Sequence, residues 1–149
     1  MTHVKFAVMA RSDKLLKAQY ETLAAFRYAL RKFIHFSETA AQAAGITPQQ
    51  HQALLAIKGF PGRDRITVGE LAERLQLRHH STVGLIDRLV LDKLVARTPS
   101  IADRRRVIIQ LTSRGEKTLE KLSTMHRKQL QQIGPELSRL LDQINFIEK

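Results

Sequence analysis

The stretch from Ile66 to Gly115 constrains the fold of this chain more than any other segment. Apolar residues recur at helical spacing over Val68–Leu75 and again from about His79 to Lys93. Only Gln76-Leu77-Arg78 stands between these two segments, which is the length of a tight turn. Thr67, with a glutamate three positions later, has the spacing of a capping box and marks the start of the first helix. The pattern therefore predicts a helix-turn-helix.

Two strand-like segments, Val95–Pro99 and Arg106–Leu111, follow the second helix. The loop between them carries the run Asp103-Arg104-Arg105-Arg106. An arginine at the tip of a β-hairpin can enter the minor groove of DNA, where A·T-rich stretches concentrate negative potential. We expect Asp103 to brace an arginine, because a free carboxylate would be repelled by phosphates; the alternative for the arginine run is a solvated charged loop. A helix-turn-helix followed by such a hairpin predicts a winged helix-turn-helix, a module that binds duplex DNA.

A long amphipathic helix is predicted before this module. Ser12 or Asp13 can cap its N-terminus, and it runs to about Ala44, where Gly45 provides a C-cap signal. Thr47-Pro48 then begins a second helix, because threonine is a good N-cap and proline fits the first helical position.

Further helices are predicted after the hairpin. One starts at Thr112 or Ser113 and ends near Ile133, because Gly134-Pro135 should interrupt it, and Glu136–Ile147 forms the last helix. These leucine-rich ends either pack on the module or pair with a second copy of the chain, and the second arrangement is the expected one. The predicted fold is mainly α with a small β-wing (α+β): one domain over 1–149, with a winged helix-turn-helix at 47–111 and dimerisation helices at 12–45 and 113–149.

Composition narrows the functional classes. The chain of 149 residues has 25 Lys and Arg against 14 Asp and Glu, a net charge of +11, which suits a nucleic-acid partner or, as an alternative, an anionic membrane surface. No apolar run approaches the roughly 18 residues of a membrane span, so we expect a soluble, cytoplasmic protein without a membrane partner. The absence of cysteine excludes disulfides, thiol nucleophiles and cysteine metal ligands.

The second helix of the module has two distinct sides when residues are placed at about 100° intervals. Thr82, Leu85, Ile86, Leu89 and Val90 fall on the side expected to face the core. The opposite side, which a major groove would meet, carries His80, Gly84, Asp87 and Leu91, flanked by Ser81 and Arg88. Gly84 either lets the helix backbone approach DNA closely or is a tolerated surface glycine.

The predicted DNA-binding residues come from three places. Arginine can donate two hydrogen bonds to a guanine, and serine or histidine can bond base edges or phosphates. The set is Arg78, His79, His80, Ser81, Gly84 and Arg88 from the helix, Asp103, Arg104, Arg105 and Arg106 from the wing, and Arg63 and Arg65 from the loop at Gly59–Arg65.

Metal and catalytic sites are not predicted. His79 and His80 are adjacent on a helix, so their side chains diverge by about 100° and cannot bind one ion together. His35 and Glu38 are more simply a surface pair. The chain has no glycine-rich phosphate loop, nucleophile elbow or metal motif, so we expect neither a cofactor nor enzymatic activity.

Several short motifs resemble the MarR family of bacterial transcriptional regulators. They are Glu70-Leu71-Ala72-Glu73-Arg74-Leu75, Asp87-Arg88-Leu89, Asp103-Arg104-Arg105 and Leu111-Thr112-Ser113-Arg114-Gly115, in this order and spacing. The resemblance implies a homodimer whose first and last helices form the dimer region and which binds a pseudo-palindromic operator as a repressor. By the family pattern, Arg105 matches the arginine that enters the minor groove and Asp103 the acid that braces it.

The same resemblance implies release from DNA by a small organic anion, often phenolic. Phe33, Phe36, His51 and Leu54 are the candidates to line its pocket, although ordinary core and interface positions are the favoured interpretation of these residues. A DNA-binding or protein-binding winged helix without an effector is the alternative function. Salt dependence distinguishes a DNA partner from a protein partner, because contacts to phosphates make the binding affinity fall steeply as the salt concentration rises.

Overall fold

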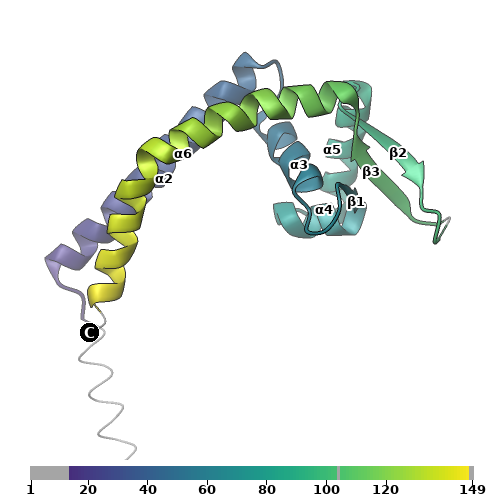
Figure 1. Cartoon of the computed structure of the whole chain (residues 1–149). Helices are drawn as coiled ribbons and strands as arrows, with labels where there is room; N and C mark the ends of the chain where they lie inside the picture. Colours follow the sequence, from purple (N-terminus) through teal and green to yellow (C-terminus); the bar gives the residue numbers. More distant parts are fainter. Residues whose placement is uncertain (1–13, 104, 148–149) are drawn as a thin grey trace, which may run out of the picture. The chain divides into compact units, whose positions relative to one another are not determined.

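The computed structural model describes residues 14–103 and 105–147 and divides them into two compact units. One unit is Phe36–Arg127, and the other combines the chain up to His35 with the chain from Lys128. The elements, labelled in Figure 1, are α2 (Lys17–Ala43), α3 (Pro48–Lys58), β1 (Arg65–Thr67), α4 (Val68–Leu75), α5 (His79–Leu91), β2 (Val95–Pro99), β3 (Val107–Leu111) and α6 (Ser113–Ile147). The predicted fold class is confirmed. Of the expected N-terminal residues, Ser12 and Asp13 lie outside the described part.

The helix starts predicted within the unit Phe36–Arg127 are confirmed. Thr47 caps α3 and forms a capping box with Gln50. Thr67 caps α4 and forms a second capping box with Glu70. Gln76 ends α4 in the left-handed region, with φ of 54°, and α5 begins at His79 after the predicted turn.

The sheet has one strand more than expected. Its order is β1-β3-β2, with both pairings antiparallel, and Ile66 of β1 lies opposite Ile109 of β3. The sequence predicts a loop over Gly59–Arg65 and a cap at Thr67, because three residues beside the turn Pro61-Gly62 carry no alternating pattern. The strand forms because β3 offers it backbone partners, which a local sequence pattern does not contain.

The core of this unit lies between α3, α4, α5 and the inner face of the sheet. Its fully buried side chains include Leu54, Ile57, Ile66, Leu71, Leu85, Ile86, Leu89, Leu94, Ile109 and Leu122. Each contributes about 1.5–3 kcal/mol by leaving water. Thr82, also fully buried, bonds the carbonyl of Arg78 at 2.9 Å, so its hydroxyl carries no unmet hydrogen bond.

The base of the hairpin is fastened to the start of α6. The Thr112 hydroxyl donates to the carbonyl of Lys93 at 2.6 Å, and its amide donates to the carbonyl of Leu94 at 3.0 Å. Gly115 packs so closely here that a Cβ would lie 2.0 Å from the oxygen of Leu94. Figure 1 shows the hairpin of β2 and β3 extending from this base beyond α4 and α5.

In the second unit, the early turns of α2 pack on the late turns of α6. Ala29 and Leu140 are buried there, and Thr22 reaches Gln143. The predicted interruption at Gly134-Pro135 is wrong, because α6 continues through both residues to Ile147. Proline removes the hydrogen bond to the carbonyl four residues before it, but the apolar stripe resumes on the far side and keeps the helix packed.

Candidate DNA interface

The two sides of α5 are the ones predicted from helical periodicity. Thr82, Leu85, Ile86 and Leu89 are buried, and Val90 packs against the same core. Arg78, His79, His80, Ser81, Asp87, Arg88 and Leu91 are exposed, and Gly84 is half-buried with open space where a Cβ would stand. The helix thus presents a polar face with its basic groups at the N-terminal end, where the helix dipole also favours an anion.

An ion pair joins this face to the hairpin. The guanidinium of Arg97, on β2, donates to the carboxylate of Asp87 on α5. Both side chains are partly exposed, so the pair contributes only about 0–1 kcal/mol to stability. The pair also compensates the negative charge that Asp87 adds to the outer face of α5.

The tip of the wing is closed by its own hydrogen bonds. The carboxylate of Asp103 accepts the backbone N–H of Arg105 at 3.0 Å, and the Arg106 carbonyl accepts from the amide of Ser100 at 2.9 Å. Asp103 therefore orients Arg105 through its backbone. Arg105 and Arg106 are exposed, as is Ile101, and Arg104 lies outside the described residues.

A groove of about 580 Å³ lies where the wing meets the starts of α4 and α5. It is lined by Thr67, Val68, Gly69, Glu70, His79, Arg105, Arg106 and Val107. The structure thus brings His79 together with Arg105 and Arg106, three of the predicted DNA-binding residues. An extended anion in this groove would meet two arginines and the first turns of two helices.

Glu70 is the acidic group in the groove, and it is already engaged. Burial raises its pKa, but the hydrogen bonds from Thr67 and the ion pair with Arg63 outweigh this and hold the pKa below the ordinary value of 4.5. The carboxylate therefore stays ionised at neutral pH while it is neutralised locally by Arg63.

Arg63 and Arg65 occupy less direct positions than the sequence suggested. Arg63 pairs with Glu70 and stacks on Phe60, 4.3 Å from the ring centroid. Arg65 is exposed on β1, with its Nε 3.8 Å from a carboxylate oxygen of Asp64. Neither lines the groove. Arg63 supports the capping box of α4, and Arg65 is available at the edge of the sheet.

The residues expected around an effector are distributed over both units. Phe36, His51 and Leu54 belong to the unit Phe36–Arg127, and Phe33 belongs to the other. His51 and Leu54 are buried in the core, and the ring of His51 lies 4.8 Å from that of His126. Sequence reasoning did not anticipate this histidine pair, because the two residues are far apart in the chain and share no spacing motif.

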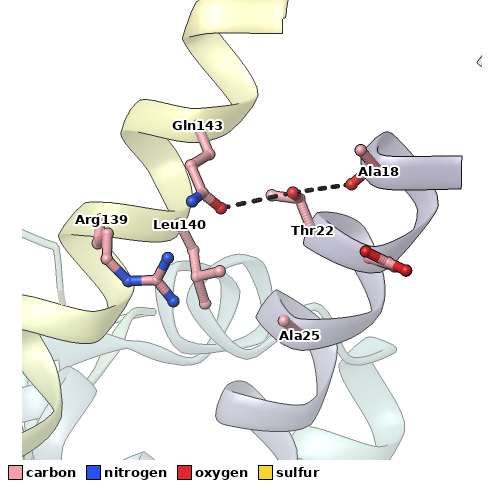
Figure 2. Close-up of a pocket in the computed structure, with 7 residues that line it drawn as sticks. Ala18, Thr22, Ala25, Arg139, Leu140 and Gln143 are labelled. Carbon is pink, nitrogen blue, oxygen red and sulfur yellow. Dashed lines mark hydrogen bonds between the residues drawn. The ribbon is translucent and has the colours of Figure 1, made fainter. Parts of the chain in front are cut away.

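A cavity of about 540 Å³ lies between α2 and α6 in the unit that contains both ends of the described chain (Figure 2). It is lined by Ala18, Glu21, Thr22, Ala25, Arg139, Leu140 and Gln143, none of which was predicted to bind a ligand. Thr22 and Gln143 point toward one another across it, at 3.4 Å. Arg139 is held by Glu136 at 2.8 Å, and Glu21 lies 3.8 Å from Lys17, so both charged lining groups already have counter-ions.

Within residues 14–103 and 105–147, no three histidine, aspartate or glutamate side chains gather closely enough to hold a metal ion. Across the same residues, no helix has the length and apolar character that crossing a bilayer would require.

Known proteins with similar sequences are regulators of transcription. The sequence model of the MarR family matches residues 44–106. The transcriptional activatory protein BadR of Rhodopseudomonas palustris is 32% identical over 64% of this chain and 55% of its own length. The HTH-type transcriptional repressor MdtR of Bacillus subtilis is 32% identical over 52% of this chain and 48% of its own. The chain spans about half the length of the curated relatives it matches.

Solved structures give the same fold over more of the chain. AbsC, a MarR family regulator from Streptomyces coelicolor, aligns with a TM-score of 0.70 at 22% identity and covers 83% of each chain. A variant of S. aureus MepR bound to an oligodeoxyribonucleotide aligns with a TM-score of 0.65 at 23% identity, over 84% of this chain and 97% of that one. Fold and surface together define a winged helix-turn-helix protein. Residues 44–106 match the sequence model of the MarR family, and over that segment the resemblance noted in the sequence is confirmed.

Proposed function

We propose that this chain is a sequence-specific DNA-binding transcriptional regulator. In this proposal it acts as a homodimeric repressor of a pseudo-palindromic operator and is released by a small phenolic or anionic effector. The observation that carries the DNA-binding part is the groove in which His79 at the start of α5 meets Arg105 and Arg106 of the wing. The net charge of +11 supports the same partner.

The proposed docking follows from the directions of these elements. The exposed face of α5 enters a major groove, with Arg78, His80 and Ser81 at base edges or phosphates. The wing follows the backbone to the adjacent minor groove, where Arg105 meets the narrow, negative floor. The phosphates between these two DNA grooves would then lie along the protein groove that His79 and Arg106 line.

The dimer is proposed from the unit that contains the early turns of α2 and the late turns of α6. Large apolar side chains remain exposed on it, namely Leu16, Tyr20, Leu23, Tyr28, Ile34, Leu130 and Leu141. A second copy would cover this surface, and two-fold symmetry would set the spacing of the two operator half-sites. As a regulator of a bacterial operator, the dimer would act in the cytoplasm.

Selection of bound sequences from a random duplex pool, at moderate salt, tests the proposal. We expect enrichment of a two-fold symmetric site whose half-sites lie about one helical turn apart. Binding without any enriched sequence would contradict a sequence-specific regulator. The effector part is tested on the selected duplex with aromatic carboxylates: no loss of binding at millimolar concentrations would remove it.

The second candidate is a winged helix that binds DNA or protein without an effector. It is favoured by the cavity of 540 Å³, because its charged lining residues Arg139 and Glu21 are already paired with other side chains and not left for a ligand. Salt titration separates the two kinds of partner. DNA binding should weaken with a slope near −0.9 per phosphate contact on logarithmic axes. A salt-independent interaction would indicate a protein partner.

A further inference from the structure

Two imidazole rings meet in the interior of the unit Phe36–Arg127. His51 comes from α3 and His126 from α6, and their ring centroids lie 4.8 Å apart with the planes tilted by 50°. His51 is 2% exposed and His126 9%. The ring of Phe36, on α2, meets His126 edge-on at 5.4 Å. Three helices therefore converge on a pair of groups that can both take up a proton.

The hydrogen bonds of His126 determine how it holds its protons. Its Nδ1 lies 2.7 Å from the carbonyl oxygen of Leu122, and because a carbonyl only accepts, Nδ1 carries a hydrogen. Its Nε2 lies 2.8 Å from the hydroxyl of Ser37. A hydroxyl donates to a bare nitrogen and accepts from a protonated one. His126 can therefore exist as imidazole or imidazolium without losing either hydrogen bond.

His51 is in the opposite situation. Its Nδ1 is buried and has no hydrogen-bond partner. A bare nitrogen in that position costs little, but a proton there would be a buried donor on a charged ring with nothing to accept it. Burial lowers the pKa of His51 below its ordinary value of 6.5, and the charge on His126 lowers it further. His51 is thus built into the fold as a neutral ring.

Among the described residues, His126 is the ionisable group whose charge lowers the pKa of His51. The other charged groups lie on the elements around α3. On α6, Arg127 is exposed, and on α2 so is Glu38. The charged groups of α4 and α5 are exposed or paired, and β3 has no ionisable residue. They are Glu70, which is paired with Arg63, together with the exposed Glu73, Arg74, His79, His80, Asp87 and Arg88, and Arg65 on β1 is exposed as well.

The residue next to His51 connects this pair to the recognition helix. Gln50 is buried, and its amide nitrogen donates to the carboxylate of Asp92 at 2.7 Å. Asp92 is the C-cap residue of α5. The amide oxygen of Gln50 accepts from the backbone of Thr47 at the start of α3. A displacement of α3 at His51 would therefore be transmitted through one side chain to the end of α5.

We propose that the His51–His126 pair is a proton-binding site that regulates the module, in which protonation of His51 separates α3 from α6 and weakens the hold of Gln50 on the recognition helix. Acidification would then lower DNA affinity. The DNA part of this inference rests on the proposed function, and the proton site itself does not.

The direction of the effect follows from linkage. A histidine whose pKa is lowered by folding stabilises the folded state fully above pH 6.5, where both states are neutral. That contribution is lost as the pH falls below 6.5, because the unfolded or open form then binds the extra proton. One proton changes the equilibrium by at most about tenfold per pH unit.

The first experiment uses the full chain without DNA. Urea unfolding at pH 7.5 and 5.5 is measured for wild type, His51→Leu, His51→Gln, His126→Gln and the exposed control His35→Gln. We expect the unfolding constants of wild type and His35→Gln to rise about three- to tenfold more between these pH values than those of the His51 variants. If His51→Leu does not fold, His51→Gln replaces it. Equal pH dependence in wild type and a folded His51 variant would overturn the inference.

Ring proton NMR provides a second, direct measurement. The Cε1–H signal of His51 should titrate below pH 6.5 in wild type, and its midpoint should move upward in His126→Gln, which removes the opposing charge. A merely structural role for the pair would not produce this shift. A midpoint for His51 at or above pH 6.5 would overturn the inference.

The DNA arm uses the duplex selected above. Between pH 7.5 and 5.5 the dissociation constant of wild type should rise about three- to tenfold relative to that of His51→Leu, since protonation of His79 and His80 is common to both proteins and cancels in the ratio. Identical profiles would overturn the regulatory part. Failure of every variant to bind any duplex would instead remove the proposed function, while the urea and NMR results would still decide the proton site.

Discussion

Arg97 and Asp87 join the wing to the outer face of the recognition helix through an ion pair. The pair keeps a carboxylate on the side proposed to face DNA from acting as a free negative charge. We therefore expect Arg97→Ala to weaken DNA binding by about tenfold, a change of roughly 1.4 kcal/mol. Asp87→Ala combined with Arg97→Ala should recover most of this loss, because the uncompensated charge is then absent. Duplex titrations of the four proteins form a double-mutant cycle, and additive losses would show that the two residues act separately.

Arg105 is held at the wing tip by the hydrogen bond between its backbone and Asp103. Arg105→Ala should weaken binding by about 1–3 kcal/mol and leave the oligomeric state unchanged. Filter binding over a range of salt concentrations and sedimentation measure the two effects. Arg27→Ala, which removes the same charge from exposed α2 outside the module, is the matched control. Near-native affinity of Arg105→Ala would remove the wing from the interface.

Glu70 links pH to the stability of α4. Because its pKa is lowered in the folded chain, its ionised form stabilises the fold above pH 4.5, and this contribution is lost as the pH falls below that value. Glu70→Gln keeps a side chain that can complete the capping box but cannot titrate. We expect its free energy of unfolding in urea to fall less than that of wild type between pH 7 and pH 3.5. Glu73→Gln, on the exposed side of the same helix, should follow wild type.

Gly115 lies against the backbone at Leu94. Gly115→Ala should destabilise the chain by several kcal/mol, since its Cβ would lie 2.0 Å from a carbonyl oxygen that belongs to the fixed base of the hairpin. Gly84→Ala is the control within another helix, where the Cβ meets nothing within 4 Å, and should stabilise by about 0.5–1 kcal/mol. Thermal unfolding compares the two. Equal effects would mean that the packing at Leu94 relaxes easily.

The late turns of α6 carry the proposed dimer interface. Ending the chain after Ile133 removes Leu140 and the exposed Leu141, and we expect the shortened protein to be monomeric at micromolar concentration. Analytical ultracentrifugation provides the measurement, and circular dichroism confirms that the module remains folded. A shortened chain that is still dimeric would place the interface elsewhere.

The parts of the fold that could be predicted are those whose signals are local. Thr47-Pro48 and Thr67 with Glu70 identify helix starts because the capping chemistry lies within four residues. Helical periodicity alone assigned the buried side of α5 around Leu85 and Ile86. Each of these features depends on neighbours in the chain, which is why the sequence contains them.

The features that could not be predicted depend on partners distant in the chain. Strand β1 exists because Ile66 pairs with Ile109, and the closeness of His51 to His126 results from the packing of α3 on α6. The continuation of α6 through Pro135 shows the converse, since a strong local signal for a helix end is overridden by the packing on both sides. In the candidate interface, the ion pair between Arg63 and Glu70 spans only seven residues, but it crosses a turn and β1 and follows no helical or strand spacing that a sequence pattern would show.

The closed tip of the wing has a consequence for how fast a duplex could be bound. Fixing the backbone of one flexible residue requires about 1–2 kcal/mol of conformational entropy. The hydrogen bonds from Ser100 to Arg106 and from Arg105 to Asp103 form during folding. Part of this conformational entropy is therefore lost before any ligand binds. A hairpin prepared in this way can enter a groove at first encounter, so its association rate is limited by orientation and diffusion and little by the search for a loop conformation.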